Sequence, residues 1–584
     1  MNLLTLALLA LVLYSAIAIT IRNAGVLPDN VSITGPVATI TTERGKDLLE
    51  ALAQPERFWR AITNLGVVAS VVAMIFSFVL LPLVAYQALT TTETTEVTRP
   101  QNVVVIPGVN EFLPLSVAPE IIFALLVGLV VHEYGHGILC RVSDIDVESM
   151  GVVLLALIPM AAFVEPNEEG IAKAAIGDRV RMFAAGITNN LIVSVIAVLL
   201  LFGPVTGAIA VASGAPVGGV DAGSPAAEAE IEGGERILSI DGQPVENETT
   251  LDNALDNADD RTVTVELASG DEVAVERSAY VSQAPVEITD QLDESEEAAT
   301  IETVDGEPIT TRQEFTEAVS DDPVVAVETD RGSFELVAGA LVSDVVGDSP
   351  LADADGVPTD RPFTVTEIDG ERIVTADDLA AATAGVEAGE TVPLEVYVDG
   401  EPTTVEVTAE QDGQLGLQTQ PGTGGVVVDD FGVDVYPAQG FLDLLGGNAT
   451  GDGVVGFLFG TFLLLMLPLA SVIEETAYNF PGFDGFNAEF YVVAAGPEGV
   501  IFLLANVLFW MAWININLAL FNCIPAFPLD GGRILHAGVE SIANRLPIQN
   551  RETVVQAVLG GTWILMVGSF LLLIFGQPLR QALL

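Results

Sequence analysis

Basic residues are scarce in this 584-residue sequence, and lysine is nearly absent. Only 21 residues are Lys or Arg, against 80 Asp or Glu, and the two lysines are Lys46 and Lys173. A chain so poor in positive charge does not suit a phosphate backbone, so we expect no nucleic-acid partner. The carboxylates are spread along the chain, and concentrated salt would screen their mutual repulsion. The composition therefore predicts a protein adapted to high salt, a halophilic one.

Cysteine and histidine are also sparse. The two cysteines, Cys140 and Cys523, lie far apart in apolar segments, which excludes a disulfide framework and a four-thiolate zinc site. We expect both to be buried, with an apolar packing role. The chain has three histidines. A motif that uses two of them is therefore specific.

Long apolar runs dominate what is present. Half of the residues are hydrophobic and the mean hydropathy is +0.51, which is too apolar for a water-soluble protein. About 20 apolar residues cross a bilayer. Runs of this length lie near 2–21, 62–87, 119–140, 183–211, 454–473, 498–523 and 555–576. The sequence predicts a polytopic α-helical membrane protein, embedded in the lipid bilayer of the cell membrane.

A water-soluble insert interrupts the apolar runs between about 212 and 450, with alternating strand-like stretches such as TVPLEVYVDG. Residues 221–245 and 345–373 share a Ser-Pro turn, a helix start, a strand, an Asp-Gly turn and a second strand. A partial third copy surrounds IETVDGEPI, residues 301–309. This order resembles PDZ domains of membrane and periplasmic proteases, which implies capture of an extended peptide or chain terminus by strand addition. The alternative is a spacer that binds nothing.

Residues 131–140, VHEYGHGILC, place ionisable groups at the end of an apolar run. His132, Glu133 and His136 fit the pattern H-E-x-x-H. On a helix, the i, i+4 histidines share one face and can bind zinc, and the adjacent glutamate can serve as a general base. Ionisable groups are costly at membrane depth and therefore mark function. The alternative, two polar side chains satisfied by neighbouring helices, gives no reason for the glutamate between them.

A third metal ligand must come from elsewhere, because a catalytic zinc site has three protein ligands and one open position. In residues 515–536, NINLALFNCIPAFPLDGGRILH, an apolar helix runs into two prolines and is followed by Asp530. A carboxylate at such a helix break needs a cation or another partner. Two histidines and a carboxylate also describe non-haem iron sites, but the spacing with its glutamate favours Zn2+. We expect His536 to support the site and not to fill its open position.

These stretches resemble the site-2 proteases, the intramembrane zinc metalloproteases of peptidase family M50. The pattern N-x-x-x-x-N-x-x-P-x-x-P-x-D-G is matched by Asn517, Asn522, Pro525, Pro528, Asp530 and Gly531, and AAGITNN at 184–190 is similar to a further family motif. The resemblance implies that His132, His136 and Asp530 are zinc ligands and that Glu133 is the general base. It makes Asn517 and Asn522, and with weaker support Asn190, candidates for contact with substrate, although polar groups that pack helices are an equal alternative.

The resemblance and the composition together divide the chain. We expect anchor spans and loops over 1–118, a first catalytic membrane half over 119–211, one PDZ-like domain over 212–290, a second with the partial repeat over 291–430, an irregular membrane-associated segment over 431–497 and a second catalytic half over 498–584.

The run at 151–164 is short and contains Pro159, so we expect it to dip into the membrane without crossing, like the hairpin of the family. Arg22, Arg44, Lys46, Arg57 and Arg60 follow the first run, so we expect the loop after that run to lie in the cytoplasm. If 151–164 dips into the membrane and 183–211 crosses it, the insert is extracytoplasmic. If 454–473 and 498–523 both crossed, Asp530 would end a membrane thickness from His132. We therefore expect 454–473 not to span. The alternative lets 151–164 span and puts the insert in the cytoplasm.

The resemblance implies an endopeptidase that cleaves a membrane-spanning segment of another protein, as in regulated intramembrane proteolysis. A second enzyme reading is a protease that clears leftover signal peptides. A catalytically silent membrane scaffold with PDZ-like domains is a further alternative, and the intact Glu133 argues against it. A transporter is disfavoured because the ionisable residues cluster as a metal triad.

Overall fold

The computed structural model divides the chain into two compact units, which we describe separately. The helical unit comprises Met1–Val211 and Gln439–Leu584, and the insert comprises Ala212–Ala438. The structure describes the chain except residues 1–2, 26, 29, 91–106, 109, 111–112, 156–157, 259, 294, 296–297, 348, 353, 355, 410–414, 449–450, 452, 474–477, 548 and 584.

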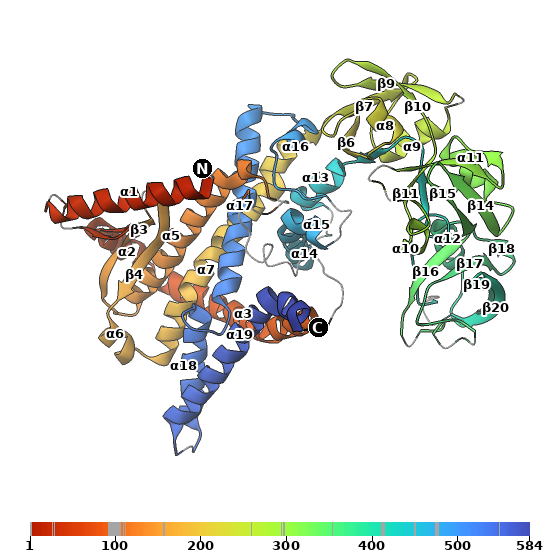
Figure 1. Ribbon diagram of the computed structural model, residues 1–584. Helices are drawn as coiled ribbons and strands as arrows, with labels where there is room; N and C mark the ends of the chain where they lie inside the picture. Colours follow the sequence, from red (N-terminus) through yellow and green to blue (C-terminus); the bar gives the residue numbers. More distant parts are fainter. Residues whose placement is uncertain are drawn as a thin grey trace. The chain divides into compact units, whose positions relative to one another are not determined.

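Long apolar helices build the helical unit (Figure 1). Within the described residues, five stretches are long and apolar enough to cross a membrane: Glu56–Leu89, Leu115–Val142, Ile176–Ala208, Glu498–Asn522 and Arg551–Gly576. They hold α3 (Glu56–Thr90), α5 (Ala118–Val142), α7 (Ile176–Leu200), α17 (Glu498–Asn522) and α19 (Arg551–Leu583). Five predicted runs are thus confirmed as helices of spanning length. The first predicted run forms α1 (Leu3–Asn23), whose side chains are only partly described.

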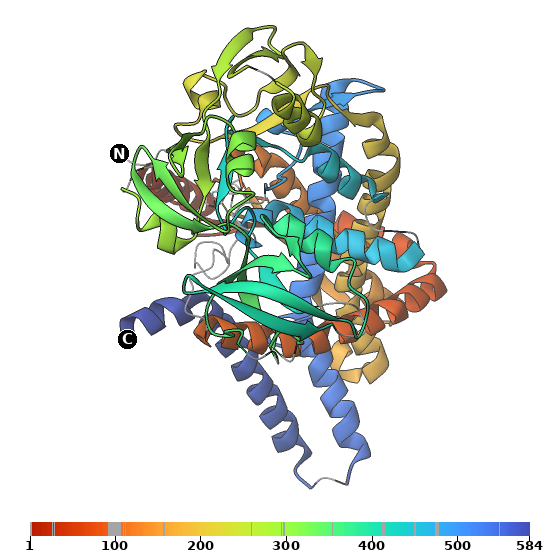
Figure 2. The ribbon, with the colours of Figure 1, turned by 90° about the vertical axis from the view of Figure 1, so that its right-hand side faces the viewer.

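Three of these helices, α5, α7 and α17, contact one another and form the centre of the unit (Figures 1 and 2). Their ends follow from the sequence. Proline at the start of α5 and Pro497 before α17 suit first-turn positions that need no N–H, and Glu120 and Glu498 lie in the positive first turns. The shorter helices of the unit are α2 (Glu43–Ala53), α6 (Glu168–Lys173), α13 (Ala438–Gly446), α14 (Gly453–Met466), α15 (Ala470–Ile473), α16 (Phe486–Glu489) and α18 (Asp530–Arg545).

A four-stranded antiparallel sheet lies against α5. Its order is β1 (Val31–Thr34), β2 (Val37–Thr41), β3 (Val147–Leu155) and β4 (Ile158–Pro166). The expected non-helical segment at 151–164 is therefore a β-hairpin, β3–β4. The sequence analysis missed β1 and β2, although VSITGPVATIT has β-branched residues on both sides of a Gly-Pro turn. β4 is the last strand of this sheet, so one of its two edges is not paired with another described strand.

A short two-stranded sheet bears on whether the segment 454–473 crosses the membrane. β5 (Ile209–Val211) follows α7 and pairs antiparallel with β24 (Tyr491–Val493), which precedes α17, with Ile209 opposite Val493. The chain therefore returns, before α17, to the end of the helical core that it left after α7. The apolar helix at Gly453–Leu469 is shorter than a span. Both observations agree with the expectation that 454–473 does not cross.

The insert contains three six-stranded sheets of the same topology, each with its own hydrophobic core. Their orders are β10-β9-β7-β6-β23, β15-β14-β12-β11-β22 and β20-β19-β17-β16-β21, with β8, β13 and β18 paired to β7, β12 and β17. We call them the first, second and third copies. The middle repeat, predicted as partial, has the same strand order as the other two and forms a complete copy among the described residues.

The elements of the copies follow one another in the same order. The first has β6 (Ala215–Val220), α8 (Pro225–Glu228), β7 (Arg236–Ile240), β8 (Gln243–Pro244), α9 (Glu248–Asp256), β9 (Thr262–Leu267) and β10 (Glu272–Glu276). The second has β11 (Tyr280–Gln283), α10 (Val286–Thr289), β12 (Ala299–Val304), β13 (Glu307–Pro308), α11 (Arg312–Ala318), β14 (Val324–Thr329) and β15 (Gly332–Val337). The third has β16 (Ala340–Val345), β17 (Phe363–Ile368), β18 (Glu371–Arg372), α12 (Ala376–Thr383), β19 (Thr391–Val398) and β20 (Glu401–Thr408).

The three copies are nested in the chain. After the third copy, β21 (Leu417–Thr419), β22 (Val427–Asp429) and β23 (Val433–Val435) return in turn to the third, second and first sheets and lie at one end of each. The Asp-Gly pairs seen in the sequence turn the chain between the paired strands of each copy, with positive φ at both residues: Asp241–Gly242, Asp305–Gly306 and Asp369–Gly370. That geometry is the type I′ hairpin, for which Asp-Gly is strongly preferred.

Candidate metal centre

His132 and His136 project from one face of α5 toward the middle of the helical unit. Their Nε2 atoms are 3.2 Å apart, and both side chains are buried, with exposed fractions of 7% and 8%. One helical turn separates the two residues, so the convergence of their rings follows from helix geometry. The predicted pair is therefore assembled on the predicted helix.

Asp530 reaches the same point from the other end of the sequence. α17 ends at Asn522 ahead of Pro525 and Pro528, and α18 begins at Asp530 itself. A Cβ atom on Gly531 would lie 2.5 Å from the carbonyl oxygens of Cys523 and Ile524, so only glycine lets the start of α18 fold this closely onto the end of α17. The Oδ2 atom of Asp530 lies 3.1 Å from Nε2 of each histidine.

The three atoms suit a zinc ion. Tetrahedral zinc with bonds of about 2.0–2.1 Å separates its ligand atoms by about 3.3 Å, close to the spacing found. Oδ2 of Asp530 is buried and accepts no hydrogen bond from any described residue. Two neutral imidazoles and an ionised carboxylate, the forms that metal binding requires, would hold the ion and leave one position open, as in catalytic zinc sites.

The outer face of His136 is held by α7. Its Nδ1 atom lies 2.8 Å from the backbone oxygen of Met182, so Nδ1 carries the proton and donates it to that carbonyl. In the neutral ring that metal binding requires, Nε2 is then the unprotonated nitrogen, and it faces Asp530. This is the usual way in which a protein fixes the tautomer of a metal-binding histidine.

Two glycines allow α5 and α7 to approach closely at this level. A Cβ atom on Gly186 would lie 2.7 Å from the ring of His132, and one on Gly135 would lie 2.6 Å from the backbone oxygen of Ala185. Larger residues would push the helices apart and move the His132 ring. The Ala-Gly pair of AAGITNN therefore has a packing role beside the first histidine.

Glu133 faces the free edge of β4. Its Oε2 atom accepts a hydrogen bond of 2.9 Å from the backbone N–H of Val164. His132, Glu133 and His136 form a cluster whose ligand atoms lie within 4.8 Å of one another. The carboxylate predicted as a base is thus fixed between the histidine pair and a strand edge.

A cavity of about 1460 Å³ opens on the three ligands and Glu133. It is lined by β4 and α6 on one side and by α7 and α18 on the other, and Asn522 is among its lining residues. Asn517 is half-buried and donates to the backbone oxygen of Trp513, and the cavity does not include it. Asn190 has no exposed surface, so the prediction that it contacts substrate is wrong for this structure. His536 lines the cavity, with its ring packed against Phe527.

Comparison with protein families agrees with this site. The model of peptidase family M50 matches residues 120–429 and 454–567, which include all three ligands and Glu133. The chain belongs to peptidase family M50. The chain is also 26% identical over 232 residues to "Putative zinc metalloprotease mll0638" of Mesorhizobium japonicum, a match that covers 37% of this chain and 56% of that protein. A shorter match, 39% over 80 residues, covers 14% of this chain and 22% of "Uncharacterized protein MJ0971" of Methanocaldococcus jannaschii.

Family membership and the helices together establish the fold class. The M50 chain is a polytopic α-helical membrane protein with a β-rich insert. Both cysteines are buried and free, as expected for packing roles.

Sequence reasoning missed several residues of the M50 site. Val164 contributes only its backbone, and Gly186 contributes only the absence of a side chain, so neither leaves a chemical signature in the sequence. Charged residues of the cavity wall were also missed, such as Arg179, which pairs with Glu540 at 2.7 Å. Charged and apolar residues alternate at the start of α7, and this pattern could have indicated that one face of the helix is in contact with water there.

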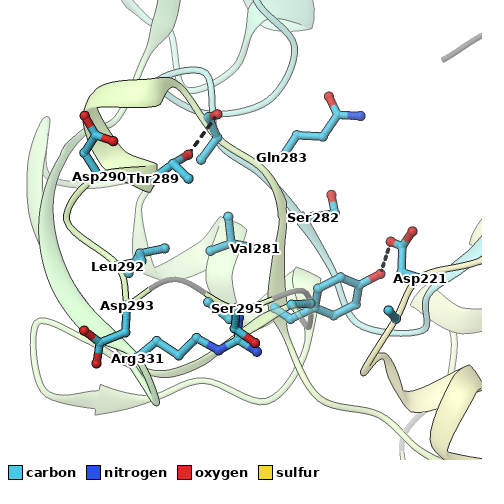
Figure 3. A pocket seen from close by; sticks show the side chains of 15 residues that line it. Asp221, Val281, Ser282, Gln283, Thr289, Asp290, Leu292, Asp293, Ser295 and Arg331 are labelled. Atoms are coloured by element: carbon cyan, nitrogen blue, oxygen red, sulfur yellow. Dashed lines mark hydrogen bonds between the residues drawn. The ribbon is translucent and has the colours of Figure 1, made fainter. Parts of the chain in front are cut away.

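A second cavity, of about 570 Å³, lies within the insert where the first and second copies meet (Figure 3). Val281 and Leu292 line its apolar part, with the charged side chains of Asp290, Asp293 and Arg331 around them. At one side the hydroxyl of Tyr280 donates to Asp221, at 2.6 Å. No metal-ligand cluster was found at this cavity among the described residues.

Proposed function

We propose that this chain is a zinc endopeptidase that hydrolyses peptide bonds in or near the membrane-spanning segments of anchored proteins. The observation that carries the proposal is the convergence of His132, His136 and Asp530, with Glu133 beside them, in one cavity of the helical unit. The zinc metalloprotease name of the Mesorhizobium japonicum relative supports the same chemistry.

The roles of the residues follow from their positions. His132, His136 and Asp530 would hold zinc, and the bound ion would supply Lewis-acid chemistry for the scissile carbonyl and for the attacking water near neutral pH. Glu133 accepts a proton from the attacking water and later delivers it to the leaving amine. Asn522 lines the same cavity and donates one amide N–H to the backbone oxygen of Leu518, and its other N–H would donate to the substrate backbone.

The free edge of β4 gives the substrate a place to bind. Peptide bonds within a helix are shielded, so the substrate must become extended before attack. Because Val164 turns its N–H toward Glu133, away from β3, the alternate residue Ala162 turns its backbone groups to the same side. A substrate strand paired along these groups would lie directly beside the base.

The test uses the full chain in detergent at high salt, with zinc content and cleavage of a model membrane-spanning substrate as the two readouts. For Glu133→Gln we expect unchanged zinc and a rate lower by about 10²- to 10⁴-fold, the usual contribution of a general base. Glu43→Gln, at an exposed glutamate of the same unit, is the matched control. Zinc with no cleavage in wild type, or full cleavage by Glu133→Gln, would overturn the proposal.

We further propose that the insert captures an extended peptide or a chain terminus in the manner of PDZ domains. Each copy ends with a returning strand at one end of its sheet, and such edges accept an added strand. The third copy has the most exposed of these strands, β21. Gly416 and Gln420 direct backbone groups to β16, so Thr419 directs its N–H outward.

Thr419→Pro removes that outward N–H and spares the bonds to β16. If β21 binds the peptide, the substitution abolishes binding of a fluorescent peptide to the full chain, while Thr419→Ala retains it. Equal binding by both variants would exclude the β21 edge, and no binding by wild type would support a spacer.

We propose that the insert is extracytoplasmic. Its exposed Ser269 offers a test, because the two native cysteines are buried and a cysteine introduced at Ser269 would be the sole accessible thiol among the described residues. An impermeant thiol reagent applied to intact cells should label Ser269→Cys. Labelling only after lysis would place the insert in the cytoplasm.

The acidic composition supports a protein that functions at high salt. Lowering the salt from about 1 M to about 0.1 M lengthens the Debye length from about 3 to about 10 Å and exposes the carboxylates to one another. We expect loss of the insert structure at low salt, seen as faster hydrogen exchange in 212–438. Unchanged exchange would remove the support for salt adaptation.

A further inference from the structure

Asn190 is buried beside the metal ligands without reaching the cavity. It lies on α7, has an exposed fraction of 0%, and its Nδ2 atom is 3.4 Å from Nδ1 of His132. Its Oδ1 atom is buried and has no hydrogen-bond partner among the described residues. The amide nitrogen of Asn190 therefore faces a ring nitrogen, whereas the amide oxygen has no hydrogen-bond partner among the described residues.

The chemistry of the ring decides which end belongs there. If the amide N–H of Asn190 faced Nδ1 of His132, then Nδ1 would be an acceptor and the ring proton would sit on Nε2. That nitrogen lies 3.1 Å from Asp530 and would be blocked as a ligand. The oxygen and nitrogen of an amide have the same shape, and half a turn about the last side-chain bond exchanges them. With the oxygen toward the ring, Nδ1 carries the proton and Nε2 is free.

We propose that Asn190 is a positioning residue, whose side-chain oxygen accepts the Nδ1–H of His132 and thereby fixes the tautomer in which Nε2 faces Asp530 and His136. The inference rests on the metal centre of the proposed function. It goes beyond it by assigning a role to a residue that touches neither substrate nor metal.

The pattern of α7 supports this role. Met182, Gly186 and Asn190 are spaced by four residues and so share one face of the helix. Met182 accepts from His136, Gly186 leaves room for the His132 ring, and Asn190 reaches the far nitrogen of that ring. One helix face thus supplies an acceptor for each histidine with a gap between them, and fixes both tautomers from outside.

The backbone of Asn190 is itself held in place. The hydroxyl of Ser194 lies 3.0 Å from the backbone oxygen of Asn190 and 3.3 Å from that of Ala512, so it bridges α7 and α17 at this level. The residue is therefore fixed between α5 and α17. A rigid acceptor is what orientation of a metal ligand requires.

The experiment compares Asn190→Leu, Asn190→Asp and the control Asn515→Leu in the full chain. Leucine has the same number of side-chain heavy atoms, branched at the same carbon, but no acceptor, whereas aspartate offers an oxygen in either orientation. Asn515 is an equally buried amide with an unpaired oxygen, packed against Gly128 one turn from His132. The first readout is zinc affinity by competition with a chelator. The second is the tautomer of each ring in metal-free protein labelled with ¹⁵N-histidine, in which the chain has just three histidines to resolve.

We expect Asn190→Leu to weaken zinc binding by about 10- to 100-fold, as for other groups that orient a metal-binding histidine, and to shift His132 toward the Nε2–H tautomer. Asn190→Asp should keep both the affinity and the Nδ1–H tautomer, and Asn515→Leu should leave both unchanged. An unchanged tautomer and affinity in Asn190→Leu would overturn the proposal. Equal losses in Asn190→Leu and Asn190→Asp, or in Asn515→Leu, would also overturn it, because they would indicate packing alone. Loss of cleavage with intact zinc binding would concern the proposed protease and not Asn190.

Discussion

The helical unit and the insert use polar residues in opposite ways. The insert, 212–438, holds 53 of the 80 acidic residues and seven of the 21 basic ones, most of them on the surface of its three sheets. The helical unit buries more polar side chains than the insert does, and several of them gather at the metal centre: His132, His136, Asn190 and Asp530. A buried polar group in an apolar interior must be paired, so its neighbours reveal its role. A solvated carboxylate has no such obligation, and its position says little about function.

One buried ion pair in the insert departs from this rule. Arg277 donates to Asp430 at 2.6 Å, and both residues are 2% exposed. Asp430 also accepts from the backbone N–H of Arg312, which begins α11. The pair therefore joins the first copy, the second copy and the returning chain, and has a structural role, unlike the buried cluster of His132, His136 and Asp530.

The largest effect is expected at Asp530. Asp530→Asn removes the charged ligand, and zinc content should fall from near one per chain to near zero after dialysis, since even outer-shell changes weaken zinc binding by about 10- to 100-fold. Tryptophan fluorescence, which reports only on the helical unit through Trp59, Trp510, Trp513 and Trp563, should show an intact fold. Retention of zinc by this variant would break the assignment of Asp530 as a ligand.

The next largest effect is expected at the buried ion pair between Arg277 and Asp430 in the insert. Arg277→Met leaves Asp430 charged and buried, which should destabilise the first and second copies by about 3–5 kcal/mol. Hydrogen exchange should accelerate within 215–338 with no change in tryptophan fluorescence. Arg361→Met, at a half-exposed pair with Asp399, is the control and should cost less than about 1 kcal/mol. A similar result for both arginines would show that burial of the ion pair is unimportant.

A smaller effect is expected from a single methyl group beside His132. Gly186→Ala places a Cβ atom against that ring, and overpacking of this kind costs about 1–3 kcal/mol. Zinc affinity should fall while the insert is unaffected. Gly538→Ala, on α18 with open space at its Cβ position, is the control. Equal zinc affinities would mean that α5 and α7 separate without cost.

The smallest effect concerns Tyr280. Burial, and then the carboxylates of Asp429 and Asp221, raise the pKa of Tyr280 above its ordinary value. The unfolded chain therefore ionises first, so the stability contributed by this residue is complete below about pH 10 and falls as the pH rises further. Tyr280→Phe should lower stability by about 1 kcal/mol at neutral pH and reduce the loss in alkali. Ultraviolet absorbance of tyrosinate, measured against pH, is the test. Ionisation of Tyr280 at the same pH as the other tyrosines would contradict the prediction.

The parts that chemistry dictates were predictable from the sequence. The H-E-x-x-H spacing on an apolar run, and Asp530 behind two prolines, located the three side chains whose polar atoms the structure brings to 3.1–3.2 Å of one another. The sequence also predicted that 454–473 does not span the membrane, because a crossing there would have left Asp530 on the opposite side from His132. The nesting of the insert was not predictable, because β21, β22 and β23 are three-residue strands that pair over long sequence distances. The role of Asn190 was likewise hidden, since a buried amide and a substrate-binding amide have the same sequence.

The pairing of β5 with β24 has an evolutionary consequence. Ile209 and Val493 are opposite each other, so everything between them begins and ends at one place on the helical core. Additions or deletions in that interval can be absorbed without shifting α17 or Asp530. The three nested copies have the order expected if each arose by duplication inside the one before it. Lineages could therefore gain or lose copies at this point while the geometry of the metal centre stays the same.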